Sequence, residues 1–223
     1  MDIGMKPTVS IIGTGMMGSG LAHGLAKAGY RVLIGSSSTV KRDELAAAIR
    51  RDVFRADIEV LDCSRESSWE ADIIIPAVPY SAQAEVAAHI KDVVTGKIVI
   101  SLVNPLNATY DGLLTPATTS AAEELAALLP DSKIVKAFNT VFSGTLINPV
   151  IQGDQADTFI AANDADATAT IAQMASDIGF NPLFAGKLDI SRTLELMAAL
   201  LIGLNIRNGY QGIAGWKVLH NAA

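Results

Sequence analysis

Three glycines directly after a short apolar segment are the residues best placed to do chemistry in this chain. Residues 9–12 are predicted to form a strand, and Gly13, Gly15 and Gly18 follow with the spacing G-x-G-x-x-G before a helix-forming stretch. In such units the first glycine permits the tight turn, the second lets the backbone approach a pyrophosphate, and the third lets the helix pack on the strand. Free amides at the helix N-terminus then face the anion. This context favours a dinucleotide site over a purely structural glycine turn, with binding residues Gly13, Thr14, Gly15, Met16, Met17 and Gly18.

The segment after the second predicted strand, residues 31–35, favours NADP over NAD. In NAD-binding versions of the unit, an acidic residue about 20 positions beyond the glycines binds the adenosine ribose. Serines and two cations occupy this region instead, and they would hold a 2'-phosphate that a carboxylate would repel. The alternative is that Ser38 or Thr39 only caps the next helix and that the cations are solvated. The predicted binding residues here are Ser36, Ser37, Ser38, Lys41 and Arg42.

Composition and charge exclude several classes of function. The chain has 223 residues, half of them hydrophobic, which is enough to bury a full core. A formal net charge of −6 argues against a nucleic-acid partner and against an anionic membrane partner, since both need clustered Lys and Arg.

The single cysteine, Cys63, excludes an intramolecular disulfide framework and a cysteine-based metal cluster, and no metal site is expected. Cys63 itself is predicted to be a buried or half-buried small apolar residue rather than a nucleophile. Residues 1–8 lack an apolar signal core and no segment approaches about 20 apolar residues, so a cytoplasmic protein is the expectation.

Strand and helix patterns alternate along the chain, which is typical of a doubly wound parallel sheet with helices on both faces. Further strands are expected at residues 58–61, 72–77, 97–103 and 133–138, and helices at residues 40–51 and 81–91. Ser120 and Glu123 form a capping box that opens a helix ending near Pro130. We therefore predict an α/β, Rossmann-type dinucleotide-binding domain over residues 1–150.

The remaining residues, 151–223, are predicted to form a small α/β and helical appendage packed on that domain. Strands are expected at residues 158–162 and 182–185, and helices at residues 164–178 and 191–208, with Asn163 as the N-cap of the first of these helices.

A general acid or base beside the reacting carbon is missing from the sequence. Dehydrogenases usually place His, Lys or Tyr there, but His23, His89 and His220 lie at positions that fit surface or packing roles. This absence points to an acceptor that takes hydride with little help from a protein acid, such as a flavin-like ring.

Several segments together resemble the NADP oxidoreductases that depend on the deazaflavin coenzyme F420, whose fold also serves as the cytoplasmic domain of the STEAP metalloreductases. Their order and spacing carry the resemblance over most of the chain. The segments are Ile12–Gly20, Leu33–Ser36, Ala77–Pro79, Val135–Thr140, Ala185–Gly186, Ser191–Arg192 and Glu195.

The resemblance implies direct hydride transfer from the nicotinamide of NADP(H) to a stacked acceptor ring, with positioning supplying most of the rate. The acceptor is expected to be coenzyme F420, a flavin or a quinone-like ring. It also implies that Asn139 and Thr140 orient the rings by hydrogen bonds. Phe138 is either a core residue or a stacking platform. The residues implied at the nicotinamide end are Ala77, Val78, Pro79 and Ala137.

Two positions depart from the family pattern. Ser37 stands where family members often carry an arginine, which leaves Lys41 or Arg42 as the phosphate partner. Asn139 stands where the deazaflavin enzymes tend to have a histidine, so the identity of the acceptor stays open.

The C-terminal stretch Leu194–Ile206 is apolar almost all round a helix, which suits a core helix, a wall of the acceptor site or a dimer contact. By resemblance, residues 151–223 form the acceptor pocket and the subunit contact, and a homodimer is expected. Arg192 and Glu195 are predicted to pair with each other or across that contact.

Two other functions remain open. The segments Gly13–Gly18 and Lys27–Tyr30 are also similar to pyrroline-5-carboxylate reductases and hydroxyacid dehydrogenases, which suggests an NADPH-dependent reductase of a small imine or carbonyl. Those proteins have a longer helical second domain. A non-catalytic NADP(H) sensor is the third hypothesis.

Overall fold

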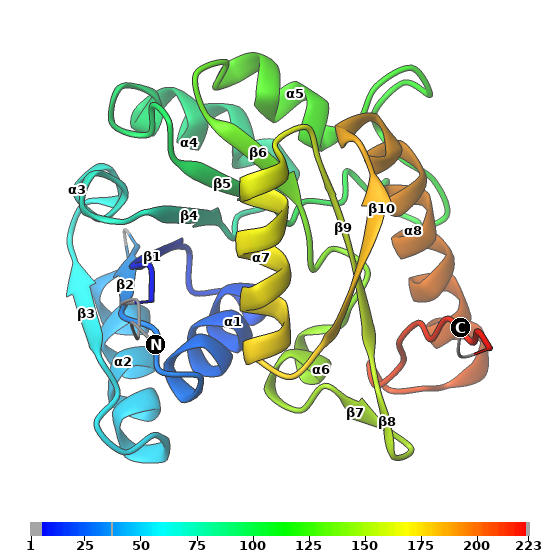
Figure 1. Ribbon diagram of the computed structural model, residues 1–223, viewed down its shortest axis with the longest axis horizontal. Coiled ribbons are helices and arrows are strands. Elements are labelled where there is room, and N and C mark those ends of the chain that lie inside the picture. The colour runs from blue at the N-terminus through cyan, green and yellow to red at the C-terminus, as the bar shows by residue number, and fades with distance from the viewer. Residues whose placement is uncertain (1–5, 37, 222–223) are drawn as a thin grey trace.

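The fold is built on one eight-stranded sheet in the order β10-β9-β6-β5-β4-β1-β2-β3 (Figure 1). The computed structural model describes residues 6–36 and 38–221. The strands of the sheet are β1 (Val9–Ile12), β2 (Val32–Gly35), β3 (Ile58–Leu61), β4 (Ile73–Pro76), β5 (Ile98–Ser101), β6 (Lys133–Lys136), β9 (Asp157–Ala162) and β10 (Asn181–Gly186). Strands β1 to β6 are parallel, whereas β9 pairs antiparallel with β6 and β10 is parallel to β9.

Helices cover both faces of this sheet. They are α1 (Met16–Lys27), α2 (Thr39–Asp52), α3 (Ser64–Glu70), α4 (Gln83–Ile90), α5 (Ala121–Leu128), α6 (Ser143–Ile147), α7 (Ala165–Asp177) and α8 (Ser191–Asn208). A two-stranded ribbon, β7 (Val150–Ile151) with β8 (Asp154–Gln155), follows α6. Within the described residues, no helix is both long and apolar enough to cross a membrane.

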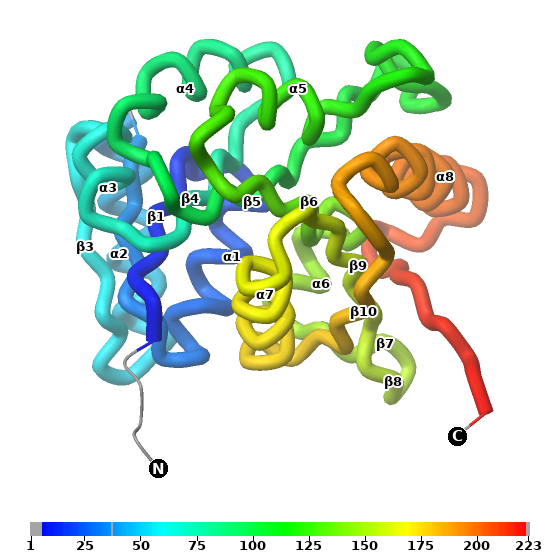
Figure 2. The backbone as a smooth tube through the Cα atoms, turned by 45° about the horizontal axis from the view of Figure 1, so that its top comes forward, coloured from blue at the N-terminus to red at the C-terminus, as the bar shows by residue number. Residues whose placement is uncertain are grey.

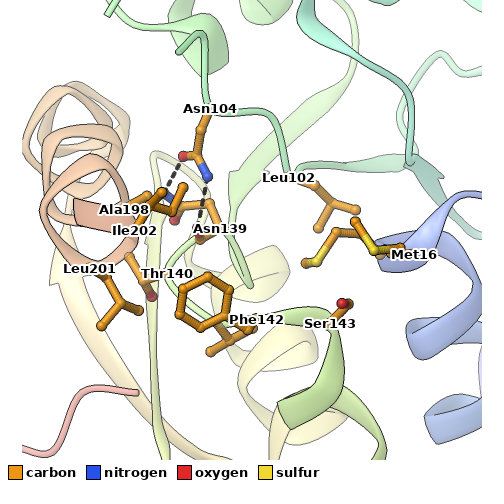
Figure 3. A pocket seen from close by; sticks show the side chains of 12 residues that line it. Met16, Leu102, Asn104, Asn139, Thr140, Phe142, Ser143, Ala198, Leu201 and Ile202 are labelled. Atoms are coloured by element: carbon orange, nitrogen blue, oxygen red, sulfur yellow. Dashed lines mark hydrogen bonds between the residues drawn. The ribbon is translucent and has the colours of Figure 1, made fainter. Parts of the chain in front are cut away.

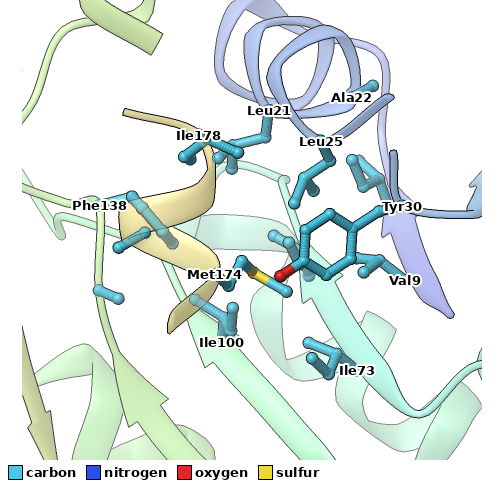
Figure 4. Packing of buried hydrophobic residues seen from close by; sticks show 14 of the residues in the cluster. Val9, Leu21, Ala22, Leu25, Tyr30, Ile73, Ile100, Phe138, Met174 and Ile178 are labelled. Atoms are coloured by element: carbon cyan, nitrogen blue, oxygen red, sulfur yellow. The ribbon is translucent and has the colours of Figure 1, made fainter. Parts of the chain in front are cut away.

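Strand β4 shows how the two layers of helices divide. Ile73 and Ile75 belong to the larger core beneath α1 and α7, where Figure 4 shows Ile73. Ile74 belongs to a second core beneath α4 and α5. All three side chains are buried, as expected for a strand that is covered on both faces. The predicted doubly wound, Rossmann-type α/β fold is therefore confirmed.

The centre of the sheet fixes where a ligand can bind. Strand β1 lies between β2 and β4, so the chain winds outward in both directions from this point. The carboxyl ends of β1 and β4 therefore border a crevice, which is where open α/β sheets bind their ligands.

Two capping predictions have different outcomes. The capping box is confirmed, because the Glu123 amide donates to Ser120 Oγ at 3.2 Å. The N-cap predicted at Asn163 is wrong: Asp164 caps α7 and accepts from the Ala167 amide at 2.8 Å. The Asn163 side chain instead accepts from the Leu188 amide at 3.0 Å, so it holds a loop rather than a helix end.

Strands β9 and β10 extend the sheet, α7 covers them, and α8 lies at the outer edge (Figures 1 and 2). After α8 the chain returns to the start of β9, where Asp157 and Trp216 form an antiparallel bridge. The Asp157 carboxylate accepts from the Val218 amide at 2.6 Å and from Lys217 Nζ at 3.0 Å. The C-terminal segment is thus held to the sheet by the same residue that begins β9.

Candidate functional site

Three adjoining hollows form one groove along the carboxyl edge of the central strands. The first, about 320 Å³, lies at Ser36 between the ends of β2 and β4, and we call it the Ser36 hollow. The second, about 340 Å³, runs past Gly15 and is called the glycine-turn hollow. The third, about 310 Å³, lies between the end of β6 and α8 and is called the β6–α8 cavity. Neighbouring hollows share lining residues: Val78 joins the first to the second, and Met16, Met17, Leu102 and Asn104 join the second to the third.

The three glycines of the turn are required for different reasons. A Cβ on Gly13 would lie 2.6 Å from the Ala77 carbonyl oxygen, and one on Gly18 would lie 2.3 Å from the Gly13 carbonyl oxygen. Gly13 also has a φ of 110°. These two glycines are therefore needed by the fold itself.

Gly15 differs, because a Cβ there would meet no described atom within 4 Å. Gly15 is the N-cap of α1 and faces the glycine-turn hollow. The first turn of α1, which the structure describes in full, carries no acidic residue, so nothing offsets the positive end of the helix dipole. Open space, free amides and a positive potential fit a pyrophosphate.

The residues predicted to contact a 2'-phosphate are separated by the structure. Ser36 lies in the Ser36 hollow at the end of β2, and Lys41 is exposed in the first turn of α2. Arg42 is buried: its guanidinium donates to the Leu61 carbonyl at 2.9 Å and pairs with Asp62 at 2.7 Å. Arg42 therefore joins α2 to the end of β3, which leaves Lys41 available to a ligand.

Of the two serines that follow Ser36, the structure describes only Ser38. Ser38 occupies the N-cap position of α2, but its hydroxyl makes no capping bond with any described residue. Ser37 lies outside the described residues.

The loop after β4 borders the glycine-turn hollow with Ala77, Val78 and Pro79. The Ala77 amide donates to the Ile12 carbonyl at 2.8 Å, which holds this loop against the end of β1. Tyr80, which sequence reasoning missed, also lines the hollow, but its hydroxyl donates to Glu124 at 2.7 Å. Burial and this carboxylate raise the pKa of Tyr80 to about 12, so Tyr80 is a poor proton donor at neutral pH.

Asn139 and Thr140 lie together in the β6–α8 cavity (Figure 3). They follow Phe138, whose φ of 58° is in the left-handed region that bulky residues avoid. Phe138 is fully buried and packs edge-to-face on Phe180, so it is a core residue, and Ala137 before it is also buried in the core.

Asn104, a second residue that the sequence did not reveal, completes this wall. Asn139 Nδ2 donates to Asn104 Oδ1 and to the Leu194 carbonyl of α8, both at 2.9 Å. Asn104 Nδ2 donates back to the Asn139 carbonyl at 2.9 Å (Figure 3). The rest of the cavity is mostly apolar, and α8 contributes Ala198, Leu201 and Ile202.

Behind this cavity lies an ion pair between Lys136 of β6 and Glu195 of α8. Both side chains are 0% exposed, and Nζ lies 2.7 Å from Oε1. Lys136 Nζ also donates to the Val103 carbonyl, and Glu195 accepts from the Ala121 and Ala122 amides at 3.1 and 3.4 Å. Burial lowers the pKa of Lys136, and the Glu195 carboxylate opposes that shift. The pair thus joins four segments: β6, the loop after β5, the start of α5, and α8.

The predicted pairing of Arg192 with Glu195 is wrong. Arg192 instead makes a two-pronged ion pair with Glu123 of α5, at 2.9 and 2.5 Å, while Glu195 points into the core. The two side chains are three residues apart on α8, but only one of them faces solvent.

The histidines and the cysteine lie away from the β6–α8 cavity. His89 lines the Ser36 hollow, with its Nε2 3.7 Å from Sγ of the half-buried Cys63. His23 lies 3.4 Å from Asp52 on the surface. Over residues 6–36 and 38–221, no cluster of three or more His, Cys, Asp or Glu side chains is arranged to hold a metal ion.

Comparison with known proteins gives three findings. Residues 8–105 match the family described as NADP oxidoreductase, coenzyme F420-dependent. The F420-dependent NADP reductase of Methanocaldococcus jannaschii is 34% identical over 213 residues, which cover 90% of this chain and 92% of that protein. Rat metalloreductase STEAP3 is 28% identical over 88% of this chain but only 37% of its own length.

A solved structure from an Arthrobacter species, provisionally assigned as an F420-dependent NADP reductase, has the same fold. Its TM-score is 0.83 at 22% sequence identity, with 96% of this chain and 100% of that chain covered.

Proposed function

Because this chain belongs to the family of coenzyme F420-dependent NADP oxidoreductases, we propose that it transfers hydride between NADP(H) and a planar redox acceptor, either coenzyme F420 or a flavin. The observation that carries the proposal is the continuity of the groove. Met16, Met17, Leu102 and Asn104 line both the glycine-turn hollow and the β6–α8 cavity, so a cofactor in one hollow would adjoin a ring in the other.

Each part of the groove has a role in this reaction. When bound, NADPH supplies hydride from nicotinamide C4. The amides at the start of α1 hold the pyrophosphate, and the loop Ala77–Pro79 borders the nicotinamide. The apolar walls of the β6–α8 cavity exclude water where the rings meet, and Asn139 and Thr140 orient the acceptor. The hydride itself needs no proton donor, and the proton that would neutralise the reduced ring would come from solvent, because the raised pKa of Tyr80 makes this residue a poor donor.

Lys41, with the hydroxyl of Ser36, is proposed to bind the 2'-phosphate of NADP, while Arg42 holds α2 against β3. Lys41→Ala should lower the affinity for NADPH by about tenfold or more, because a hydrogen bond to a charged group contributes about 1.5–3 kcal/mol. The affinity for NADH should stay nearly unchanged. Lys27→Ala, at the opposite end of α1, is the matched control. If Lys41→Ala lowers the affinities for NADPH and NADH equally in direct titration, the assignment is wrong.

The identity of the acceptor is tested by NADPH oxidation with coenzyme F420, with riboflavin and with 1-pyrroline, each supplied separately. Turnover with either ring supports the proposal, and the rate ratio tells which ring is preferred. Turnover with 1-pyrroline alone would favour an imine reductase instead. Tight NADPH binding without turnover on any of the three would indicate a sensor.

We also propose that residues 151–223 supply the acceptor wall and a contact with a second copy of the chain. The outer face of α8 is apolar and exposed and lies beside the loop after β5. Asp111 of that loop and Arg207 of α8 give the surface one acidic and one basic side chain, which can pair with each other across a two-fold dimer. Light scattering after gel filtration tests this, and a monomeric mass would refute it. The surface comprises Tyr110, Asp111, Leu196, Leu200, Ile206 and Arg207.

A further inference from the structure

One wall of the Ser36 hollow has no role in the proposed reaction. It is formed by α4, from which Glu85, Val86 and His89 line the hollow. Helix α4 follows β4, whereas Ser36 follows β2, and β1 lies between these two strands. The α4 wall and Ser36 therefore lie on opposite sides of the hollow, with the end of β1 between them.

The floor between these two sides suits a planar ring. It is apolar, and two of its residues are glycines, which have no side chain. The hollow adjoins the proposed pyrophosphate site at Val78, and the opposite end of the groove is assigned to the rings that exchange hydride. A dinucleotide that lies along the groove would therefore place its adenine over this floor. The floor comprises Ile12, Gly13, Gly35, Val78 and Val86.

Glu85 is the polar side chain of the α4 wall that is free to contact a ligand. It is exposed in the first turn of α4. Across residues 6–36 and 38–221, no ion pair or side-chain hydrogen bond engages its carboxylate. His89, one turn further along the helix, instead has its Nε2 3.7 Å from Cys63 Sγ. A ligand in the Ser36 hollow can therefore reach the Glu85 carboxylate directly.

The charge of Glu85 determines which part of the nucleotide can lie beside it. A carboxylate only accepts hydrogen bonds, and it repels a phosphate. The 2'-phosphate is thus expected on the far side, at Ser36 and Lys41, and the base on the side of α4. Adenine carries an exocyclic amine that donates hydrogen bonds. Hypoxanthine carries a carbonyl oxygen at the same ring position, which would face the carboxylate as a second acceptor.

We propose that Glu85 selects adenine as the base of the cofactor. Its carboxylate accepts a hydrogen bond from the exocyclic amine, while Val78 and Val86 contact the ring. This inference rests on the proposed function and deepens it. The nucleotide is then recognised at three places: the pyrophosphate at the glycine turn, the 2'-phosphate at Lys41, and the base at Glu85.

The test compares the binding of NADP+ and deamino-NADP+, in which hypoxanthine replaces adenine, to the full chain by calorimetry. Wild-type protein should bind deamino-NADP+ about tenfold more weakly, within the range expected for the loss of a hydrogen bond to a charged group. Glu85→Gln keeps the size of the side chain, and its amide can accept from adenine or donate to hypoxanthine, so the two affinities should become nearly equal. Asp166→Asn is the matched control, because Asp166 is an exposed acid in the first turn of α7, and it should preserve the tenfold difference.

Two results would overturn the assignment of Glu85 alone. If wild-type protein binds deamino-NADP+ as tightly as NADP+, or more tightly, the amine is not recognised, and this comparison does not depend on the folding of any variant. If Glu85→Gln retains the tenfold difference, another group recognises the base. Failure of wild-type protein to bind either nucleotide would overturn the proposed function together with this inference.

Discussion

Replacing Lys136 by methionine removes the positive charge from a carboxylate that has no access to water. Glu195 is 0% exposed and would keep only the two amide hydrogen bonds from the start of α5. Removing one partner of a buried ion pair costs about 3–5 kcal/mol, because the remaining charge is neither solvated nor paired. For a chain of this size, that loss corresponds to a fall of about 6–20 °C in melting temperature.

Two further variants distinguish the loss of stability caused by the unpaired charge from the loss caused by changed packing. In Lys136→Met with Glu195→Leu, no buried charge remains, so most of the lost stability should return. Lys133→Met is the matched control on the same strand, since Lys133 pairs with Asp164 at 3.1 Å while both side chains stay over one-third exposed. An exposed pair of this kind contributes less than about 1 kcal/mol.

The measurements are urea unfolding and steady-state kinetics of the three variants. If Lys136→Met loses no more stability than Lys133→Met, the reasoning about the buried charge is wrong. If the double variant is as unstable as the single one, the loss comes from packing. In the folded single variant, KM for the acceptor should rise more than kcat falls, because the pair positions Val103 and α8 without touching the rings. The dissociation constant of NADPH should change less than this KM, because the pair contacts only one lining residue of the glycine-turn hollow, Val103.

Two more predictions concern the glycine turn and the C-terminal segment. Gly18→Ala should destabilise the fold, since its Cβ would lie 2.3 Å from a backbone oxygen. Gly15→Ala should leave the melting temperature unchanged but should lower the affinities for NADPH and NADH equally in titrations. Burial raises the pKa of Asp157, but hydrogen bonds from an asparagine side chain and from the C-terminal segment outweigh this and hold the pKa below its ordinary value. The stability from Asp157 is therefore present above its unfolded pKa of about 3.9 and is lost as the pH falls through the lower folded value. Trp216 emission should report this loss on acidification, and Asp157→Asn should remove the part of the pH dependence that comes from Asp157.

The fold could be predicted from the sequence wherever local pattern and tertiary packing agree. The apolar strands, the glycine turn and the capping box at Ser120 are examples. Helix α3 was not predicted, because its sequence is polar and has no apolar stripe. It is formed by packing of a serine face: Ser67 Oγ lies 2.9 Å from Ser10 Oγ of β1, and a Cβ on Gly35 would lie 2.7 Å from Ser67 Oγ. Such a contact depends on neighbours distant in sequence, which a local pattern does not contain.

The site was predictable in part for a similar reason. The glycine turn is a local motif, but the bonds of Asn104 to Asn139 join residues that are 35 apart in sequence. Lys136 and Glu195 are 59 residues apart, although each left a signal: Lys136 is the single charge in the apolar run Ile134–Phe138, and Glu195 is the single charge in the apolar stretch Leu194–Ile206. Lone charges in apolar segments must find a partner or a ligand when they are buried.

Three kinds of departure from ordinary folding preferences occur together in one short segment, residues 136–140. It contains a buried ion pair, a bulky residue with a positive φ, and two buried polar atoms without a described partner. The left-handed conformation of Phe138 costs about 1–3 kcal/mol, but truncating a buried phenylalanine costs about 3–5 kcal/mol, so packing on Phe180 maintains the turn against its strain. At the glycine turn, by contrast, each backbone requirement is met by a residue that suits it. Strain that is retained in a buried segment is typical of functional sites, and under the proposed function this segment borders the acceptor.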